Sequence, residues 1–177
     1  MAQPAYIKKY GIRVAKMPFN HIHSAEKDEE VTEYSYLVVG TKTMSGEEWV
    51  KANLFSVLVQ CFHNLGLLRC FAIYLHHEKS IGYTDFYTRL FGWITAHPES
   101  TAGQAYQKID AILQKFVRGE GTATYYNPDF GTVIWRHEEG SFLEIVSRSE
   151  RFYSEIADFL LSFGIDENIY NDILRYQ

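Results

Sequence analysis

Apolar residues recur at intervals of three and four along most of this chain, the spacing that places them on one face of an α-helix. Glycine, proline and polar capping residues interrupt the pattern between successive segments. Ser45 and Glu48 have the spacing of a capping box ahead of an apolar run, so a helix is expected to begin at Ser45. The pattern predicts helices over residues 45–64, 67–77, 83–95, 100–117, 138–163 and 167–176.

Extended structure is predicted near the N-terminus. Residues 34–41 (YSYLVVGT) are rich in aromatic and β-branched side chains and contain a glycine at which a strand would end. Residues 6–17 predict a short helical or extended segment that is broken at Gly11 and ended by Pro18.

Two further segments lack helical periodicity. Residues 20–33 are polar and charged and are expected to form a solvated loop, whereas residues 122–135 contain the turn sequence NPDFG and predict a short hairpin or an extended loop. No repeat or domain boundary stands out. The expected fold class is therefore mainly α (α+β), a single helical domain over residues 1–177 with about five to six helices and a small N-terminal β element.

The composition is that of a globular protein. Of the 177 residues, 46% are hydrophobic and 16% aromatic, which provides enough apolar surface for a core and excludes a low-complexity chain. The net charge is −5 and no run of lysine or arginine forms a basic stripe, so nucleic acid is not an expected partner.

Signals for export and membrane insertion are missing from the sequence. The N-terminus has no uninterrupted apolar stretch with a cleavage site, and the uncharged stretch of residues 52–68 falls short of the roughly 20 apolar residues of a membrane span. Cys61 and Cys70 lie in apolar stretches, as buried thiols do in a reducing compartment. We therefore expect a cytoplasmic protein with no membrane partner.

The helix predicted over residues 45–64 carries an uncharged polar stripe. From Ala52 to Leu65 it has no formally charged residue if His63 is neutral, so nearly its whole circumference is expected to be shielded from water. Buried amides need hydrogen-bond partners, which either a polar network with neighbouring helices or a cavity filled by water or ligand would supply. His63 is the titratable member and could act as an acid or base near neutral pH. The stripe, our candidate pocket lining, consists of Asn53, Ser56, Gln60, His63 and Asn64.

Histidines suggest two weaker hypotheses. His21 and His23 could bind one metal ion together with Asp28 or Glu29 if the segment were extended, but a pair of solvated loop histidines has the same sequence. The sequence His76–Glu78 could likewise bind a metal, or could complement the dipole in the last turn of a helix. We therefore assign no metal site, and keep His21 and His23 as weak candidates.

Aromatic residues are frequent between positions 71 and 93 and have helical spacing, which indicates core packing, with a stacking platform for a ligand as the alternative. They are Phe71, Tyr74, Phe86, Tyr87, Phe91 and Trp93. The motifs GxSxG, GxGxxG, the P-loop and HExxH do not occur, so no common hydrolase, dinucleotide, nucleoside-triphosphate or zincin chemistry is indicated.

The order of segments resembles a known family. The runs YIKKYGIRV, YLVVGTKTMSGEEWVKANLFS, VQCFHNLGLL, YTDFYTRLF and the terminal DILRYQ are similar to the region that follows the catalytic core in radical S-adenosylmethionine (radical SAM) enzymes with an N-terminal cobalamin-binding domain. In that family a strand with a V-G-T-x-T-M-S turn leads into a helix with E-W-x-x-A. The matching positions are Val39, Gly40, Thr41, Thr43, Met44, Ser45, Glu48, Trp49 and Ala52.

The resemblance implies a C-terminal accessory domain that covers the open side of the core barrel and helps to shape the pocket for a small-molecule substrate. Its partner would be the catalytic radical SAM core, on the same chain or a separate one. The parent family implies an iron-sulfur (4Fe-4S) cluster, S-adenosylmethionine and cobalamin. Cys61 and Cys70 do not supply the family's CxxxCxxC loop, and its DxHxxG motif does not occur, so no catalytic or cofactor-binding residue is assigned in this chain.

Three functional hypotheses follow. The first is this accessory domain, which is not catalytic by itself and which, when isolated, would expose an apolar docking surface and self-associate. The alternative is an independent small-molecule-binding helical domain whose cavity is lined by Asn53, Gln60, His63 and Asn64. The third is a metal-dependent enzyme that uses His21, His23 and an acidic neighbour.

Overall fold

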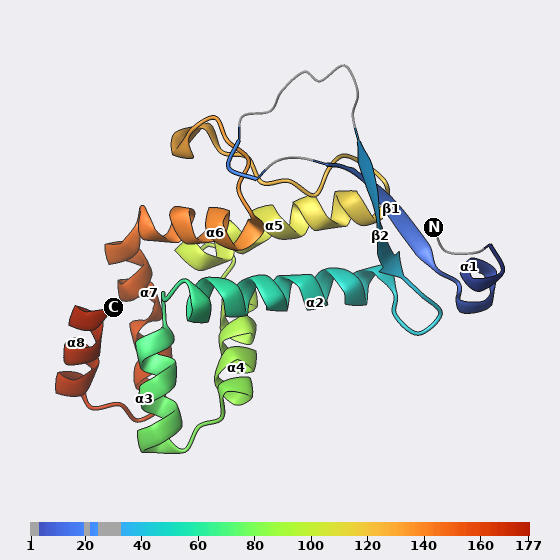
Figure 1. Ribbon diagram of the computed structural model, residues 1–177. Coiled ribbons are helices and arrows are strands. Elements are labelled where there is room, and N and C mark those ends of the chain that lie inside the picture. The colour runs from blue at the N-terminus through green and yellow to red at the C-terminus, as the bar shows by residue number, and fades with distance from the viewer. Residues whose placement is uncertain (1–3, 20–21, 25–32) are drawn as a thin grey trace. The chain divides into compact units, whose positions relative to one another are not determined.

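The computed structural model describes residues 4–19, 22–24 and 33–177. This part of the chain contains eight α-helices, one π-helix, one 3-10 helix and a two-stranded antiparallel sheet (Figure 1). The prediction of a mainly α fold with a small N-terminal β element is confirmed. The chain divides into two compact units. We call Met1–Leu54 with Lys108–His137 the ribbon unit, and Phe55–Gln107 with Glu138–Gln177 the helical unit.

The ribbon unit begins with a helix and a β-ribbon. Helix α1 (Pro4–Tyr10) ends at Gly11, whose φ of +59° suits glycine, and strand β1 (Arg13–Pro18) follows. The segment is therefore helical before Gly11 and extended after it. Strand β2 (Tyr34–Gly40), predicted from residues 34–41, pairs with β1 in antiparallel register.

One face of the β-ribbon forms a small core with two helix ends of the same unit. Ala15 of β1 and Val39 of β2 are buried with Phe116 of α5 (Thr101–Val117). Trp49 of α2 (Gly46–Val59) lies against Phe116, with ring centroids 6.1 Å apart. Two strands alone bury too little apolar surface to be stable, so this helix packing supports the ribbon.

The capping box at the start of α2 is confirmed. Glu48 N donates to Ser45 Oγ at 3.1 Å, and Ser45 N donates to Glu48 Oε2 at 2.6 Å. The two hydrogen bonds satisfy backbone donors that the first helical turn leaves free. The bonds from Ser45 also lower the pKa of the Glu48 carboxyl.

The end of the predicted helix 45–64 differs from a regular α-helix. After Val59 the chain continues as the π-helix η1 (Gln60–Asn64), in which Leu65 N donates to Gln60 O, five residues earlier, at 2.9 Å. The expected shielding of the whole circumference is wrong, because Ala52, Ser56 and Asn64 are exposed. The opposite face is buried and carries the apolar residues Val57, Leu58 and Phe62. The segment is therefore amphipathic, with one buried face and one exposed face.

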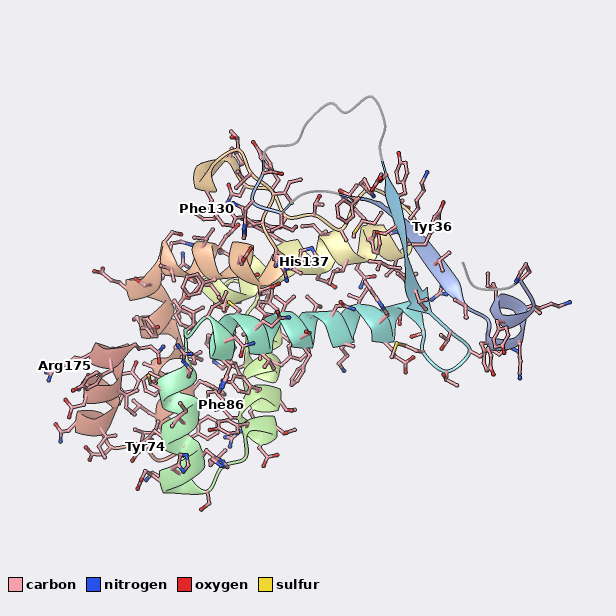
Figure 2. The ribbon with its side chains drawn as sticks, in the orientation of Figure 1. Tyr36, Tyr74, Phe86, Phe130, His137 and Arg175 are labelled. Carbon is pink, nitrogen blue, oxygen red and sulfur yellow. The ribbon has the colours of Figure 1, made fainter. Side chains whose placement is uncertain are left out.

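The helical unit is built from η1, α3 (Arg69–Lys79), α4 (Tyr83–Ala96), α7 (Ser149–Leu161), α8 (Glu167–Tyr176) and the parts of α2, α5 and α6 (His137–Val146) that it contains. Helix α3 packs against α4, α8 and η1. Phe86 of α4, labelled with Tyr74 of α3 in Figure 2, is buried against Phe159 and Phe163. Cys61 is buried in this unit, Cys70 is half-buried, and both thiols are free, as predicted.

The single helix predicted over residues 138–163 is wrong. The chain forms α6 (His137–Val146) and then α7, separated at Ser147 and Arg148. Ser147 Oγ and Arg148 Nε both donate to the carbonyl oxygen of Glu144, at 3.0 and 3.3 Å. Side chains that bond to a helix carbonyl in this way compete with the helical backbone, which explains the break.

The segment 122–135 is a loop rather than a regular hairpin. It contains one isolated bridge, between Tyr125 and Trp135, and the 3-10 helix η2 (Pro128–Phe130). Asn127 caps η2, since its side chain accepts a hydrogen bond from Asp129 N at 3.1 Å. Of the two alternatives predicted from the sequence, the extended loop therefore agrees better with the structure than the hairpin does.

No single helix in the described ranges has the length and apolar composition of a membrane span. The segments Gly46–Asn64 and Arg69–Lys79, bent by 85° between them, meet that test only as a pair.

We predict opposite effects for alanine at two helical glycines of the helical unit. A Cβ at Gly103 would overlap the carbonyl oxygen of His97 and lie 2.8 Å from Pro98 Cα, whereas a Cβ at Gly92 would meet no atom within 4 Å. Gly103→Ala should therefore lower the free energy of unfolding by about 1–3 kcal/mol. Gly92→Ala should raise it by roughly 0.5–1 kcal/mol, because alanine is the better helix former. Urea unfolding of both variants measures this, and equal shifts would contradict the close approach at Gly103.

Candidate functional site

A pocket of about 400 Å³ lies in the helical unit. Its lining comes from the end of α2, from η1 and from the start of α4. The volume is within the range of small-molecule sites, and no lining residue is aspartate, glutamate, lysine or arginine. The lining residues are Phe55, Val59, His63, Tyr83, Thr84 and Tyr87.

His63 is held in this pocket by two tyrosines of α4. Its Nδ1 lies 2.8 Å from Tyr87 Oη, a hydrogen bond whose donor depends on the imidazole tautomer. The rings of Tyr83 and Tyr87 stand nearly perpendicular to the imidazole, at 80° and 82°. His63 also belongs to η1, and the wider turn of a π-helix is frequent at functional sites.

The tyrosine partner stays protonated. Burial raises the pKa of Tyr87 well above its ordinary value, the nearby Tyr83 raises it further, and Arg69 opposes the shift. With the phenol neutral, the pair has two states: Tyr87 donates to His63, or His63 donates to Tyr87. The first state leaves the remaining proton on Nε2 of His63, and the second leaves Nε2 as an acceptor.

Three other members of the predicted stripe form hydrogen bonds within α2 or between α2 and η1. Asn53 Nδ2 donates to the carbonyl oxygen of Trp49 at 2.8 Å, and Gln60 Nε2 donates to Ser56 Oγ at 3.1 Å. Asn64 is exposed. The stripe also crosses from the ribbon unit, which contains Asn53, into the helical unit. Of its five members, His63 lines the pocket described above, and a ligand role for the others stays a prediction.

The candidate metal ligands do not form a cluster in the described part of the chain. His21 lies outside the described residues, and the ring of His23 contacts that of Trp135 at 5.3 Å. His76 and His77 lie in the last turn of α3, where His76 stacks on Tyr83 at 4.5 Å. Within the described ranges, no three histidine, cysteine, aspartate or glutamate side chains could share a metal ion.

Sequence reasoning missed most of the pocket. It placed Tyr87 among core aromatics, which is right for its burial but leaves out its bond to His63. A signal was present, because Phe55, Val59 and His63 follow one another at intervals of four, as do Tyr83 and Tyr87. Such spacing puts each set along one helix face.

The iron-sulfur cluster that the resemblance implies does not fit the cysteines of this chain. An iron-sulfur cluster of the 4Fe-4S type is held by several cysteine thiolates, and the sequence contains only two cysteines. Burial raises the pKa of the Cys61 thiol, which opposes formation of the thiolate ligand.

Comparison with known proteins confirms the predicted resemblance. No family model matches the chain. It is 25% identical, over 98% of its length, to the cobalamin-dependent radical SAM methyltransferase TokK of Streptomyces tokunonensis. It is 27% identical, again over 98% of its length, to the 2-(S-pantetheinyl)-carbapenam-3-carboxylate methyltransferase of Streptantibioticus cattleyicolor. The chain spans 28% of the length of each of these enzymes.

We predict that Tyr87→Phe changes how stability depends on alkaline pH. Because the folded state raises the pKa of Tyr87, its contribution is complete below the ordinary tyrosine pKa of about 10 and is lost as the pH rises above it. At neutral pH the free energy of unfolding of the variant, measured with urea, should be lower by about 1 kcal/mol, because the hydrogen bond to His63 is lost. Its further loss of stability above pH 10 should be smaller than that of the wild type.

The control for this experiment is Tyr176→Phe, which alters a tyrosine that is 86% exposed. It should leave both the neutral-pH stability and the alkaline slope unchanged. A Tyr87→Phe variant with the wild-type slope would contradict a buried, proton-retaining phenol at this position.

Proposed function

We propose that this chain is an accessory domain on the substrate side of an enzyme similar to cobalamin-dependent radical SAM methyltransferases, and that it is not catalytic by itself. The observation that carries the proposal is the extent of the match. Nearly the whole chain aligns, but with little more than a quarter of each relative. Its two cysteines also make it an unsuitable site for a 4Fe-4S cluster, which would then belong to a catalytic core outside this chain.

The pocket supports a role in binding part of a small substrate. Phe55, Tyr83 and Tyr87 offer aromatic surface, and His63 and Thr84 offer polar groups without a permanent charge. Such a lining would favour an uncharged, flat or aliphatic group with one or two hydrogen-bonding atoms. His63 would orient this group through Nε2, which donates or accepts according to the direction of the hydrogen bond between Nδ1 and Tyr87 Oη.

A second candidate function is an independent small-molecule-binding domain. It is favoured by one observation, namely that all six lining residues belong to the helical unit. The two functions differ in whether a catalytic core binds this chain.

The first test is complex formation. A form of the Streptantibioticus cattleyicolor methyltransferase that lacks the segment matched by this chain would be mixed with the purified chain, and the mass measured by light scattering. We expect a one-to-one complex. If the partner is folded and still binds S-adenosylmethionine but forms no complex with the chain, the accessory role is contradicted. The independent small-molecule-binding domain would then be the remaining candidate function.

The pocket is tested separately, on the chain alone. Indole, a neutral flat probe, should shift the ring resonances of His63 and Tyr87 in NMR spectra more than indole-3-carboxylate does at equal concentration. Thr84→Trp, which narrows the lined space, should weaken the effect of indole at least several-fold. Thr88→Trp, one turn further along α4 and not in the lining, is the matched control. Equal effects of both substitutions would exclude this pocket as the binding site.

A further inference from the structure

The two strands of the β-ribbon differ in how their edges are protected. Strand β1 carries Arg13, Lys16 and Pro18, and charges and proline are the usual means by which an edge strand avoids pairing with other chains. Strand β2, with the sequence YSYLVVG, has neither. It is a seven-residue strand with aromatic and β-branched side chains, the composition that favours addition of another strand.

The second edge of β2 is unpaired in the described part of the chain. The sheet has two strands, and β2 pairs with β1 alone. Several of its side chains are also exposed: Tyr36, labelled in Figure 2, is 60% exposed and Val38 is 49% exposed, whereas Val39 is buried. A two-stranded sheet gains stability from a third strand, so this edge is expected to accept one.

We propose that β2 pairs in antiparallel register with β2 of a second copy of this chain, to form a four-stranded sheet with Leu37 at the two-fold axis. In this register Tyr36 of each copy lies opposite Val38 of the other. Pairs of aromatic and β-branched residues across antiparallel strands are favourable. Such pairing is self-complementary, as a two-fold symmetric interface requires.

Charge favours a second copy as the occupant. No charge in β2 repels its own copy, since the strand contains no aspartate, glutamate, lysine, arginine or histidine. The cationic residues Arg13 and Lys16 lie on β1, so the β1 strands of the dimer would be separated by both β2 strands, at about 5 Å per strand spacing. The inference goes beyond the proposed function and does not depend on it, because the pocket belongs to the other unit.

The test measures the oligomeric state of the full chain and of variants by sedimentation equilibrium. The wild type should show a concentration-dependent dimer. The double variant Tyr36→Glu with Val38→Glu should be monomeric, because the new carboxylates of one copy would face those of the other. Residue 36 pairs with Lys16 of β1 in the same copy, so a glutamate at position 36 is compatible with the fold of the monomer. Circular dichroism checks that the variant is folded. The matched control is Val14→Glu, equally exposed at 50% but on β1, which should still dimerise.

A second measurement addresses the register and does not need a destabilised variant. Leu37→Cys in a Cys70→Ser background should form a disulfide between two copies under mild oxidation, because paired residues at the axis lie about 4.5–5.5 Å apart between Cα atoms. Leu54→Cys in the same background is the control and should not cross-link efficiently. A monomeric wild type, a dimer that persists in the double glutamate variant, or a dimer without the Leu37→Cys cross-link would overturn the proposal.

Discussion

Burial of one face of η1 is the constraint on which the helical unit depends. Phe62 has no exposed surface, and its ring contacts those of Tyr106 and Phe152, from α5 and α7. A side chain packed on two sides in this way fixes the rotation of its own helix. That rotation determines where His63, the next residue, lies, so the hydrophobic core and the candidate site are set by the same few residues.

The elements follow closely from local sequence, whereas the site does not. Helix α8 was predicted with its observed limits, and the Ser45–Glu48 capping box formed as expected, because both depend on neighbours along the chain. The break between α6 and α7 was missed because apolar periodicity continues through it, while two side chains compete for one carbonyl. The bond between His63 and Tyr87 joins residues 24 positions apart, and one sequence contains no information on which distant partner is chosen.

The relatives and the structure inform different parts of the functional question. Similarity along 98% of the chain connects it to methyltransferases of known class, but it does not indicate which residues meet a ligand. The geometry of η1 and α4 supplies those residues and assigns no reaction to them. Together they support the proposal of a domain that binds a substrate group while another part of an enzyme carries out the chemistry.

The uncharged lining of the pocket has a consequence for how binding there responds to its surroundings. Dissolved salt weakens interactions between charges and leaves contacts of aromatic rings nearly unchanged. None of the six lining residues is an aspartate, glutamate, lysine or arginine. A neutral ligand would therefore bind with nearly the same affinity in dilute and in concentrated salt.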